Sequence, residues 1–354
     1  MDFLFDIPFL GVLFQLIAYL IETIPRIAPG ILAGATPIAL GAMCGILCER
    51  SGVVNIGIEG MMLTGAFVGF MVGSGVAVAF PAGEGTAIFG ITLPLLIGMF
   101  AAVLSAVVLA VVHAWLSISV RADQIISGTI INIAAIGLTS YLNRLLGSSL
   151  DGAGRFDSFA PPAFLTDLPF VGWILRMFLD QGPIAMSVIL IIIFMQIMLF
   201  RSRWGLRTRA VGEHPKAADT VGVNVIRLRY KNVILGGVLA GLGGAYLTLE
   251  ATGTFQNGMT AGRGYIALAA VIFGRWTPVG AFLAALLFAG TDRLGVAISI
   301  RPPTGSLGDL LAVIPDQFFA ALPYIITIVI LAGVVGRSIP PAAVGRPYEK
   351  ESTA

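Results

Sequence analysis

The stretch "IAMSVILIIIFMQIMLF", residues 184–200, decides the fold class, because it is almost entirely apolar over its whole length. A bilayer core of about 30 Å takes roughly 20 apolar residues as a helix, and only helices or closed barrels satisfy the backbone there. A barrel strand would alternate apolar and polar residues over about 10 positions, and this stretch does not alternate. It therefore predicts a membrane-spanning helix.

The rest of the chain has the same character. It is 57% hydrophobic and 11% charged, with a mean hydropathy of +0.95, whereas soluble domains average about 25% charged residues. We expect an all-α polytopic membrane protein with about ten transmembrane helices, some of them broken or half-spanning. The predicted crossings are 7–24, 28–48, 53–73, 88–115, 123–144, 184–200, 232–250, 264–274, 277–293 and 318–336.

Positive charge indicates how these helices are oriented, because Lys and Arg are retained preferentially in short cytoplasmic loops. With both termini cytoplasmic, about two thirds of the 21 Lys and Arg residues fall on that side. This orientation makes residues 201–231 a cytoplasmic loop. It makes residues 146–182 an external loop, with a short interfacial helix expected around Trp173–Leu179.

The two cysteines, Cys44 and Cys48, lie one helical turn apart on an apolar segment. A pair cannot complete a tetrahedral zinc site, and only His113 and His214 are available to join it. We therefore expect a packing face there and no metal site.

The segment "RTRAVGEHPKAADTVGVNVIRLRYK", residues 207–231, is a polar island in this apolar chain. Pro215 suits the first position of a helix and Gly222 suits its exit, so a short helix is predicted between them. Such a helix is stable only when it docks on something. Charge leaves two interpretations open, a loop whose arginines fix topology beside anionic lipid, and a docking helix for a cytoplasmic partner.

Four sequence segments resemble one known family. Residues 209–223, "RAVGEHPKAADTVGV", resemble the cytoplasmic coupling loop of bacterial ABC-importer permeases of the ribose, branched-chain amino acid and nucleoside group. Residues 48–67, "CERSGVVNIGIEGMMLTGAF", are more similar to the nucleoside (guanosine-type) members. So are residues 258–281, "GMTAGRGYIALAAVIFGRWTPVGA", and residues 331–350, "LAGVVGRSIPPAAVGRPYEK". The resemblance covers about residues 30–350.

The resemblance implies that residues 1–354 form a single transmembrane permease domain in the bacterial cytoplasmic (inner) membrane, supplying half of a translocation path. The implied partners are a second homologous permease, a cytoplasmic ABC ATPase that binds ATP and magnesium, and an external substrate-binding protein, either a lipoprotein or periplasmic. Membrane lipid surrounds the chain, and no nucleic acid is expected.

The chain itself is expected to bind no cofactor and to be no enzyme. A phosphate-binding loop needs Gly-Lys followed by Ser or Thr. The three lysines, Lys216, Lys231 and Lys350, instead follow Pro, Tyr and Glu. The energy for transport would therefore come from the separate ATPase.

The resemblance also implies which residues meet that ATPase. They match the family's coupling helix, which sits in a groove of the nucleotide-binding subunit, and they are Glu213, Pro215, Lys216, Ala217, Ala218 and Asp219. The two alanines would allow close approach of the partner. The charged residues would contact the rim of the groove.

Polar residues at bilayer depth are candidates for the translocation path, because a charge there costs at least about 2.5 kcal/mol. Glu59 lies within an apolar stretch, and Asn55 precedes it by one turn on the same predicted face. The structural alternative is a carboxylate hydrogen-bonded near a helix end. Gly52, Gly57 and Gly60 favour a broken helix in this region.

Three further path candidates, Gln124, Ser127 and Asn132, lie on the crossing 123–144, although such residues more often bridge helices. We expect Glu250 to pair with Arg263, and the glycine-rich run 235–247 to serve helix packing. Substrate classes other than nucleosides, namely ribose or other simple sugars and branched-chain amino acids, remain alternatives.

Two other functional classes are considered. An ion-coupled secondary carrier would need a membrane carboxylate, for which Glu59 is the candidate. A membrane enzyme would need converging catalytic side chains, which two distant histidines and two adjacent cysteines do not supply.

Overall fold

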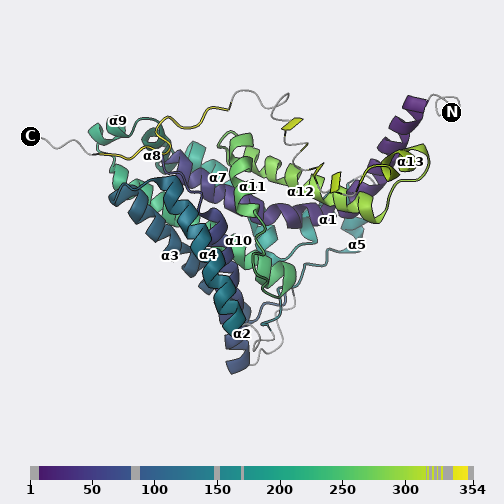
Figure 1. Cartoon of the computed structure of the whole chain (residues 1–354), viewed down its shortest axis with the longest axis horizontal. Helices are drawn as coiled ribbons and strands as arrows, with labels where there is room; N and C mark the ends of the chain where they lie inside the picture. The colour runs from purple at the N-terminus through teal and green to yellow at the C-terminus, as the bar shows by residue number, and fades with distance from the viewer. Residues whose placement is uncertain are drawn as a thin grey trace, which may run out of the picture. The chain divides into compact units, whose positions relative to one another are not determined.

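The computed structural model describes residues 8–80, 88–146, 152–168, 171–315 and 338–349, together with isolated positions between 317 and 329. Within these residues the regular elements are helices and no strand occurs, as Figure 1 shows. Among the described residues, seven helices are long and apolar enough to cross a membrane, and an eighth apolar helix is shorter. The all-α, multi-pass class is therefore confirmed. The expected count of about ten crossings is not confirmed by the seven found in this part of the chain.

The elements follow one another along the chain in this order. They are α1 (Pro8–Arg50), α2 (Ile58–Ala79), α3 (Leu93–Ala114), η2 (Trp115–Ser119), α4 (Gln124–Leu146), α5 (Ala163–Thr166), α6 (Gly172–Leu179), α7 (Pro183–Arg201), α8 (Arg203–Glu213), α9 (Pro215–Thr220), α10 (Val225–Ala245), η4 (Tyr246–Thr252), α11 (Arg263–Phe273), α12 (Pro278–Ile300) and α13 (Ser306–Ala312). The segments η2 and η4 are π-helical turns that extend α3 and α10.

Most predicted crossings match these helices, with two exceptions. The expected separation of 7–24 from 28–48 is wrong, because α1 runs unbroken through Pro25 and Pro29. Proline inside a membrane helix is tolerated where neighbouring groups satisfy the carbonyl groups that it frees. The tenth predicted crossing, 318–336, lies largely outside the described residues. The short helix predicted around Trp173–Leu179 is confirmed as α6.

The chain divides into two compact units. The first comprises Met1–Ala35, Ala160–Gln181 and Leu286–Gly336. Within it, the side chain of Gln181 donates hydrogen bonds to the carbonyls of Pro29 and Met177, both at 2.9 Å. These bonds tie the segment that follows α6 to α1.

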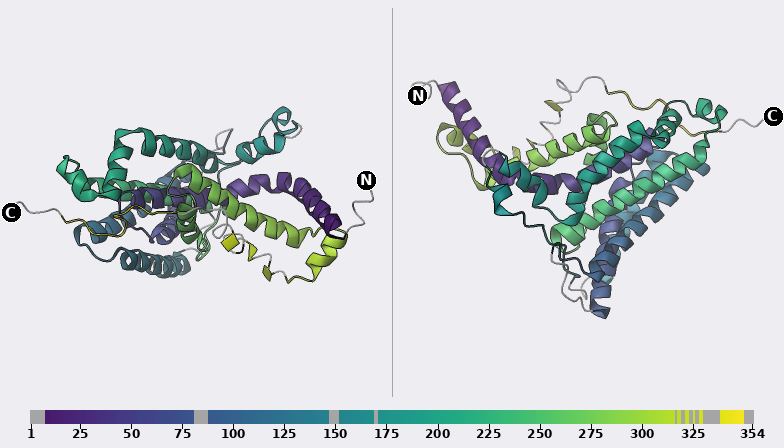
Figure 2. Two further views of the ribbon diagram at one scale, coloured as in Figure 1. Left: turned by 90° about the horizontal axis from the view of Figure 1, so that it is seen from above. Right: turned by 180° about the vertical axis from the view of Figure 1, so that it is seen from behind.

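The second unit comprises Thr36–Phe159, Gly182–Ala285 and Arg337–Ala354. Its core is formed by α2, α3, α4 and α10, of which α2 packs against each of the others (Figure 1, Figure 2). Glycines bring α10 close to its neighbours. A Cβ added at Gly237 would lie 2.5 Å from the Cβ of Ala110, and one at Gly244 would lie 2.3 Å from the carbonyl oxygen of Met62. The predicted packing role of the 235–247 run is confirmed.

The half-length helix α11 lies along the second half of α1 within this unit. A Cβ at Gly41 would lie 2.9 Å from the Cβ of Ala267, and one at Gly45 would lie 3.0 Å from Val271. At the end of α1, the Glu49 carboxylate accepts a hydrogen bond of 2.5 Å from the indole nitrogen of Trp276. The half-spanning helix predicted over 264–274 is therefore present and is fixed to α1.

Candidate functional site

The chain unwinds at residues 51–57, between α1 and α2. Gly52 adopts φ +89°, a conformation that glycine tolerates far better than other residues. Backbone that leaves a helix inside a protein must find hydrogen-bond partners outside that helix. One partner is Arg229 of α10, whose Nε donates to the carbonyl of Ser51 at 3.0 Å. The first residues of the predicted crossing 53–73 are therefore non-helical, whereas α2 itself runs unbroken from Ile58 through Gly60 to Ala79.

Side chains of α4 supply most of the remaining partners. Gln124 accepts a hydrogen bond from the amide of Val54 at 2.7 Å. Asn132 accepts from the amide of Gly60 at 2.7 Å and donates to the carbonyl of Ile56 at 3.0 Å. Both predicted path residues therefore bridge α4 to the unwound segment, the alternative role considered for them.

Ser127 reaches the same segment through a histidine. Its hydroxyl lies 3.0 Å from Nδ1 of His113, and Nε2 of His113 lies 2.9 Å from the carbonyl oxygen of Val54. His113 is fully buried on α3. This role of His113 was not predicted, although a single imidazole in an apolar helix itself indicates a buried hydrogen-bond network.

Glu59 lies in the first turn of α2 and holds the start of another helix. Its two carboxylate oxygens accept hydrogen bonds from the amides of Gly262 at 2.8 Å and Gly264 at 2.6 Å, at the N-terminus of α11. A carboxylate is stabilised there by the unpaired amides and by the helix dipole. A Cβ at Gly264 would lie 2.6 Å from the Cα of Glu59, so this approach requires glycine.

Asn55 lies in the unwound segment before α2 begins, so its predicted position on one helical face with Glu59 is wrong. Its amide nitrogen lies 3.7 to 3.8 Å from the sulfur atoms of Cys44, Cys48 and Met61. Both cysteines are buried thiols that pack against Gly236. The predicted packing face is confirmed, and the described residues contain no group of three potential metal-ligating side chains.

The expected pair between Glu250 and Arg263 is wrong. Glu250 accepts hydrogen bonds from the amides of Ile184 at 2.7 Å and Ala185 at 3.1 Å, at the start of α7. Arg263 donates to backbone carbonyls within its own turn, at Met259 and Thr260. A helix N-terminus offers a buried carboxylate two fixed donors, which replace the flexible guanidinium as its partner.

The polar island, residues 207–231, contains most of α8, all of α9 and the first two turns of α10. Ser202 caps α8 by accepting from the amide of Gly205 at 3.1 Å. The second helix begins at Pro215 and spans six residues, and Gly222 follows it with φ +82°. The short predicted helix is confirmed, whereas α8 was not predicted. A Ser immediately before a helix is the signal that would have found it.

The predicted coupling residues divide into exposed and buried members. Glu213, Lys216 and Ala217 are exposed, and Pro215 and Asp219 are partly buried. Ala218 is only 4% exposed and packs with a cluster formed by Val211, Val225, Leu228 and Tyr348. The methyl group of Ala218 therefore fills this protein's own core, and of the two alanines predicted to allow close approach of a partner only Ala217 is exposed.

Residues 338–349, which we term the C-terminal segment, run beside α8 and α9, as Figure 1 shows in yellow. The amide of Ala343 donates to the carbonyl of Gly212 at 2.8 Å, and that of Ala342 donates to the Glu213 carboxylate at 3.1 Å. The predicted rim residue Glu213 is therefore bonded within the chain. These contacts of the C-terminal segment were not predicted from its sequence.

Comparison with known proteins identifies the family. A family model described as "Branched-chain amino acid transport system / permease component" matches residues 27–331. The guanosine ABC transporter permease protein NupQ of Bacillus subtilis is 37% identical over 94% of this chain and 98% of its own. The nucleoside ABC transporter permease protein NupC of Lactococcus lactis is 34% identical over 93% of this chain and 98% of its own. No solved structure matches the chain.

Proposed function

The chain belongs to the family of branched-chain amino acid transport system permease components, and we propose that it is the membrane subunit of an ABC importer for nucleosides. The observation that carries the substrate class is the similarity to NupQ and NupC over nearly the whole length of all three chains. Seven membrane-length apolar helices support a role as a path across the bilayer.

Energy enters this permease through α9. An exposed surface formed by Lys216 and Ala217 suits the groove of a cytoplasmic ATPase. Because α9 has six residues, it depends on the packing of Ala218 against the cluster below it. Movement of the ATPase would therefore displace the helix together with that cluster, shifting the permease between its access states.

The polar wall of the path includes the unwound segment 51–57 and the α4 residues that hold it. Its buried members are Asn55, Glu59, Gln124, Ser127 and Asn132. Most of their polar groups are bonded to backbone of the same chain. Their proposed role is to keep an irregular backbone in one conformation beside the solute, as discontinuous helices do in other transporters.

The assembly implied by this role contains further components. Residues 1–354 act as one permease domain that pairs with a second homologous permease and lies in lipid of the bacterial cytoplasmic membrane. The other partners are an ABC ATPase, which holds ATP and magnesium, and an external substrate-binding protein. Both termini and the loop 201–231 face the cytoplasm, and the loop 146–182 faces outward.

Uptake measurements in cells deleted for this chain test the substrate class. We expect loss of radiolabelled guanosine and other nucleoside uptake, with restoration by a plasmid copy of the gene. Ribose and branched-chain amino acids serve as comparison solutes in the same cells. Retained nucleoside uptake with loss of ribose or amino acid uptake would replace the proposed substrate while keeping the importer.

A further inference from the structure

The C-terminal segment contacts both candidate sites of the second unit. Near its start it bonds to the end of α8 through Gly212 and Glu213. Further along, the amide of Gly345 donates to the carbonyl of Gly52, in the unwound segment, at 3.3 Å. The C-terminal segment therefore contacts both the end of α8, which precedes α9, and the non-helical segment 51–57 between α1 and α2.

Arg229 is the junction between these two regions. Its Nη1 donates to the carbonyl of Arg346 at 3.0 Å, while its Nε donates to the carbonyl of Ser51 at the same distance. The side chain is only 1% exposed, so both bonds lie in a region shielded from water. A Cβ at Gly52 would lie 2.6 Å from Nη2 of Arg229, which means that glycine is needed there for space as well as for its φ.

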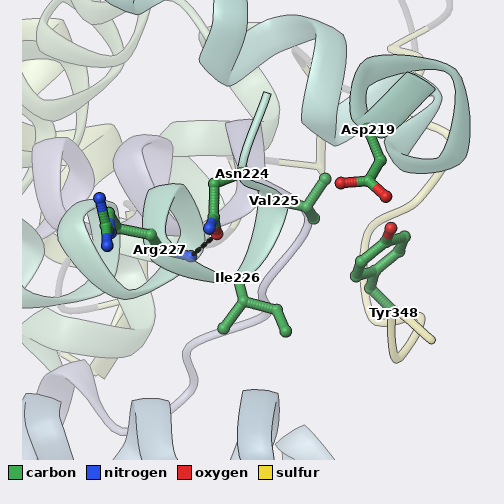
Figure 3. A pocket seen from close by; sticks show the side chains of 6 residues that line it. All are labelled: Asp219, Asn224, Val225, Ile226, Arg227 and Tyr348. Carbon is green, nitrogen blue, oxygen red and sulfur yellow. Dashed lines mark hydrogen bonds between the residues drawn. The ribbon is translucent and has the colours of Figure 1, made fainter. Parts of the chain in front are cut away.

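The end of the segment is anchored on the α9 side. Tyr348 is 8% exposed and packs in the same cluster as Ala218 and Val225. Beside it lies a cavity of about 370 Å³ lined by Tyr348, by Asp219 of α9, and by residues 224–227 at the start of α10. Figure 3 shows the Tyr348 hydroxyl directed toward the Asp219 side chain. Tyr348 therefore contacts the core on which the coupling helix rests.

The segment has the composition of a stiff connector. Pro340, Pro341 and Pro347 each fix one backbone angle, and the turn between them is closed by hydrogen bonds from the amides of Val344 and Arg346 to the carbonyls of Pro341 and Ala343. Gly345 adopts φ +75° at the turn that brings its amide to Gly52. A stiff chain with bonded ends transmits a displacement, whereas a flexible one would absorb it.

We propose that the C-terminal segment transmits movement of α9 to the unwound segment 51–57, with Tyr348 and Arg229 as its positioning residues. The inference rests on the proposed function, because it needs an ATPase that moves α9. Displacement of the cluster around Ala218 carries Tyr348 with it, and the backbone at Arg346 then shifts the Arg229 guanidinium and the Ser51 carbonyl bonded to it.

The test compares guanosine uptake with ATP hydrolysis in proteoliposomes that contain the complete importer. Tyr348→Ala removes the ring from the cluster, and Tyr348→Phe retains it. Ile339→Ala is the matched control, because Ile339 is a 73% exposed residue of the same segment. We expect Tyr348→Ala to lower guanosine transported per ATP hydrolysed by about fivefold or more, the usual lower range for coupling between sites. The other two variants should keep the wild-type ratio.

An equal ratio in wild type and Tyr348→Ala would overturn the inference. If Tyr348→Ala does not assemble, the exposed ion pair between Arg121 and Glu349, 2.7 Å apart, decides instead. Glu349→Lys should then lower the ratio about twofold, the scale of an exposed pair, and adding Arg121→Glu should restore it. An unchanged ratio in Glu349→Lys overturns the inference. Absence of ATP-driven guanosine uptake by the wild type would instead refute the proposed function.

Discussion

Two buried carboxylates, Glu59 and Glu250, hold the starts of two helices at the residue scale. Each accepts hydrogen bonds from two backbone amides of an element distant in sequence. A carboxylate at a helix N-terminus gains from the dipole and from charge-assisted bonds, which offset the cost of its burial. These residues therefore fix α11 and α7 relative to their neighbours. Both carboxylate oxygens of Glu59 already accept backbone hydrogen bonds, which disfavours a role for Glu59 as the ion-binding group of a secondary carrier.

Replacing Glu59 by Gln should destabilise the protein and lower transport. The amide side chain places a donor where Glu59 now has an acceptor, so one amide at the start of α11 loses its partner. Hydrogen bonds to charged groups contribute about 1.5–3 kcal/mol. We expect a lower melting temperature for the detergent-purified protein. Glu22→Gln is the control, since its side chain is 65% exposed in a surface ion pair, and equal melting temperatures in both variants would contradict this role for Glu59.

Removing the side chain of Asn132 should loosen the unwound segment. The amide of Gly60 and the carbonyl of Ile56 would lose their partners, at a cost of about 1–3 kcal/mol each. We expect Asn132→Ala to speed hydrogen–deuterium exchange in the peptide that contains residues 51–60. Thr129→Ala, an exposed position on the same helix, should leave that exchange unchanged. Equal exchange in the two variants would show that Asn132 does not hold this backbone.

The sequence indicated which residues are polar at membrane depth but not which partners they choose. Charge alone suggested Arg263 for Glu250, and the structure gives the start of α7 instead. Nearly every residue type has a backbone amide, so the sequence does not mark which helix start will bind a given carboxylate. Such pairings depend on tertiary packing, so only the polar character of Glu59, Gln124 and Asn132 was predictable.

At the scale of elements, small residues determine how closely helices pack. Gly241 of α10 faces α3, where an added Cβ would lie 2.6 Å from the Cα of Val103. A Cβ added at Gly137 of α4 would meet no other atom of the described residues within 4 Å. We expect Gly241→Leu to abolish a monodisperse peak in size-exclusion chromatography, while Gly137→Leu retains it. A normal peak for Gly241→Leu would mean that α10 can move away from α3 at little cost.

Helix α9 offers a second matched pair. Ala217 is exposed, so Ala217→Trp should fold normally while weakening binding of the partner ATPase at least about tenfold, equivalent to about 1.4 kcal/mol. Ala218 is buried, so Ala218→Trp should lower the yield of folded protein. Co-purification with a tagged ATPase measures the first effect. Undiminished binding by Ala217→Trp would place the docking surface elsewhere.

Element boundaries were predictable where hydropathy or turn residues mark them. The apolar runs gave α4, α7 and α11 nearly to the residue, and Pro215 with Gly222 gave α9. The helix α8 was not predicted because its several arginines are also typical of a basic cytoplasmic loop. The unbroken α1 was missed because proline usually ends a helix in water, whereas membrane helices accommodate it.

At the scale of the whole molecule, the proposed function depends on the few polar segments of an apolar chain. Composition predicted the membrane class, and local motifs predicted the permease family, which the match over residues 27–331 confirms. The division into two units and the C-terminal segment's contacts with Gly52 and Gly212 were not predictable, because hydropathy carries no information about contacts between distant backbone groups.

The most direct test of the importer is guanosine uptake into proteoliposomes that hold this chain with its permease, ATPase and binding-protein partners. We predict uptake that requires ATP and stops when the ATPase carries a hydrolysis-deficient substitution, with this chain unchanged. Uptake that persists with the inactive ATPase, or that this chain supports alone under an ion gradient, would contradict the assignment and favour an ion-coupled carrier.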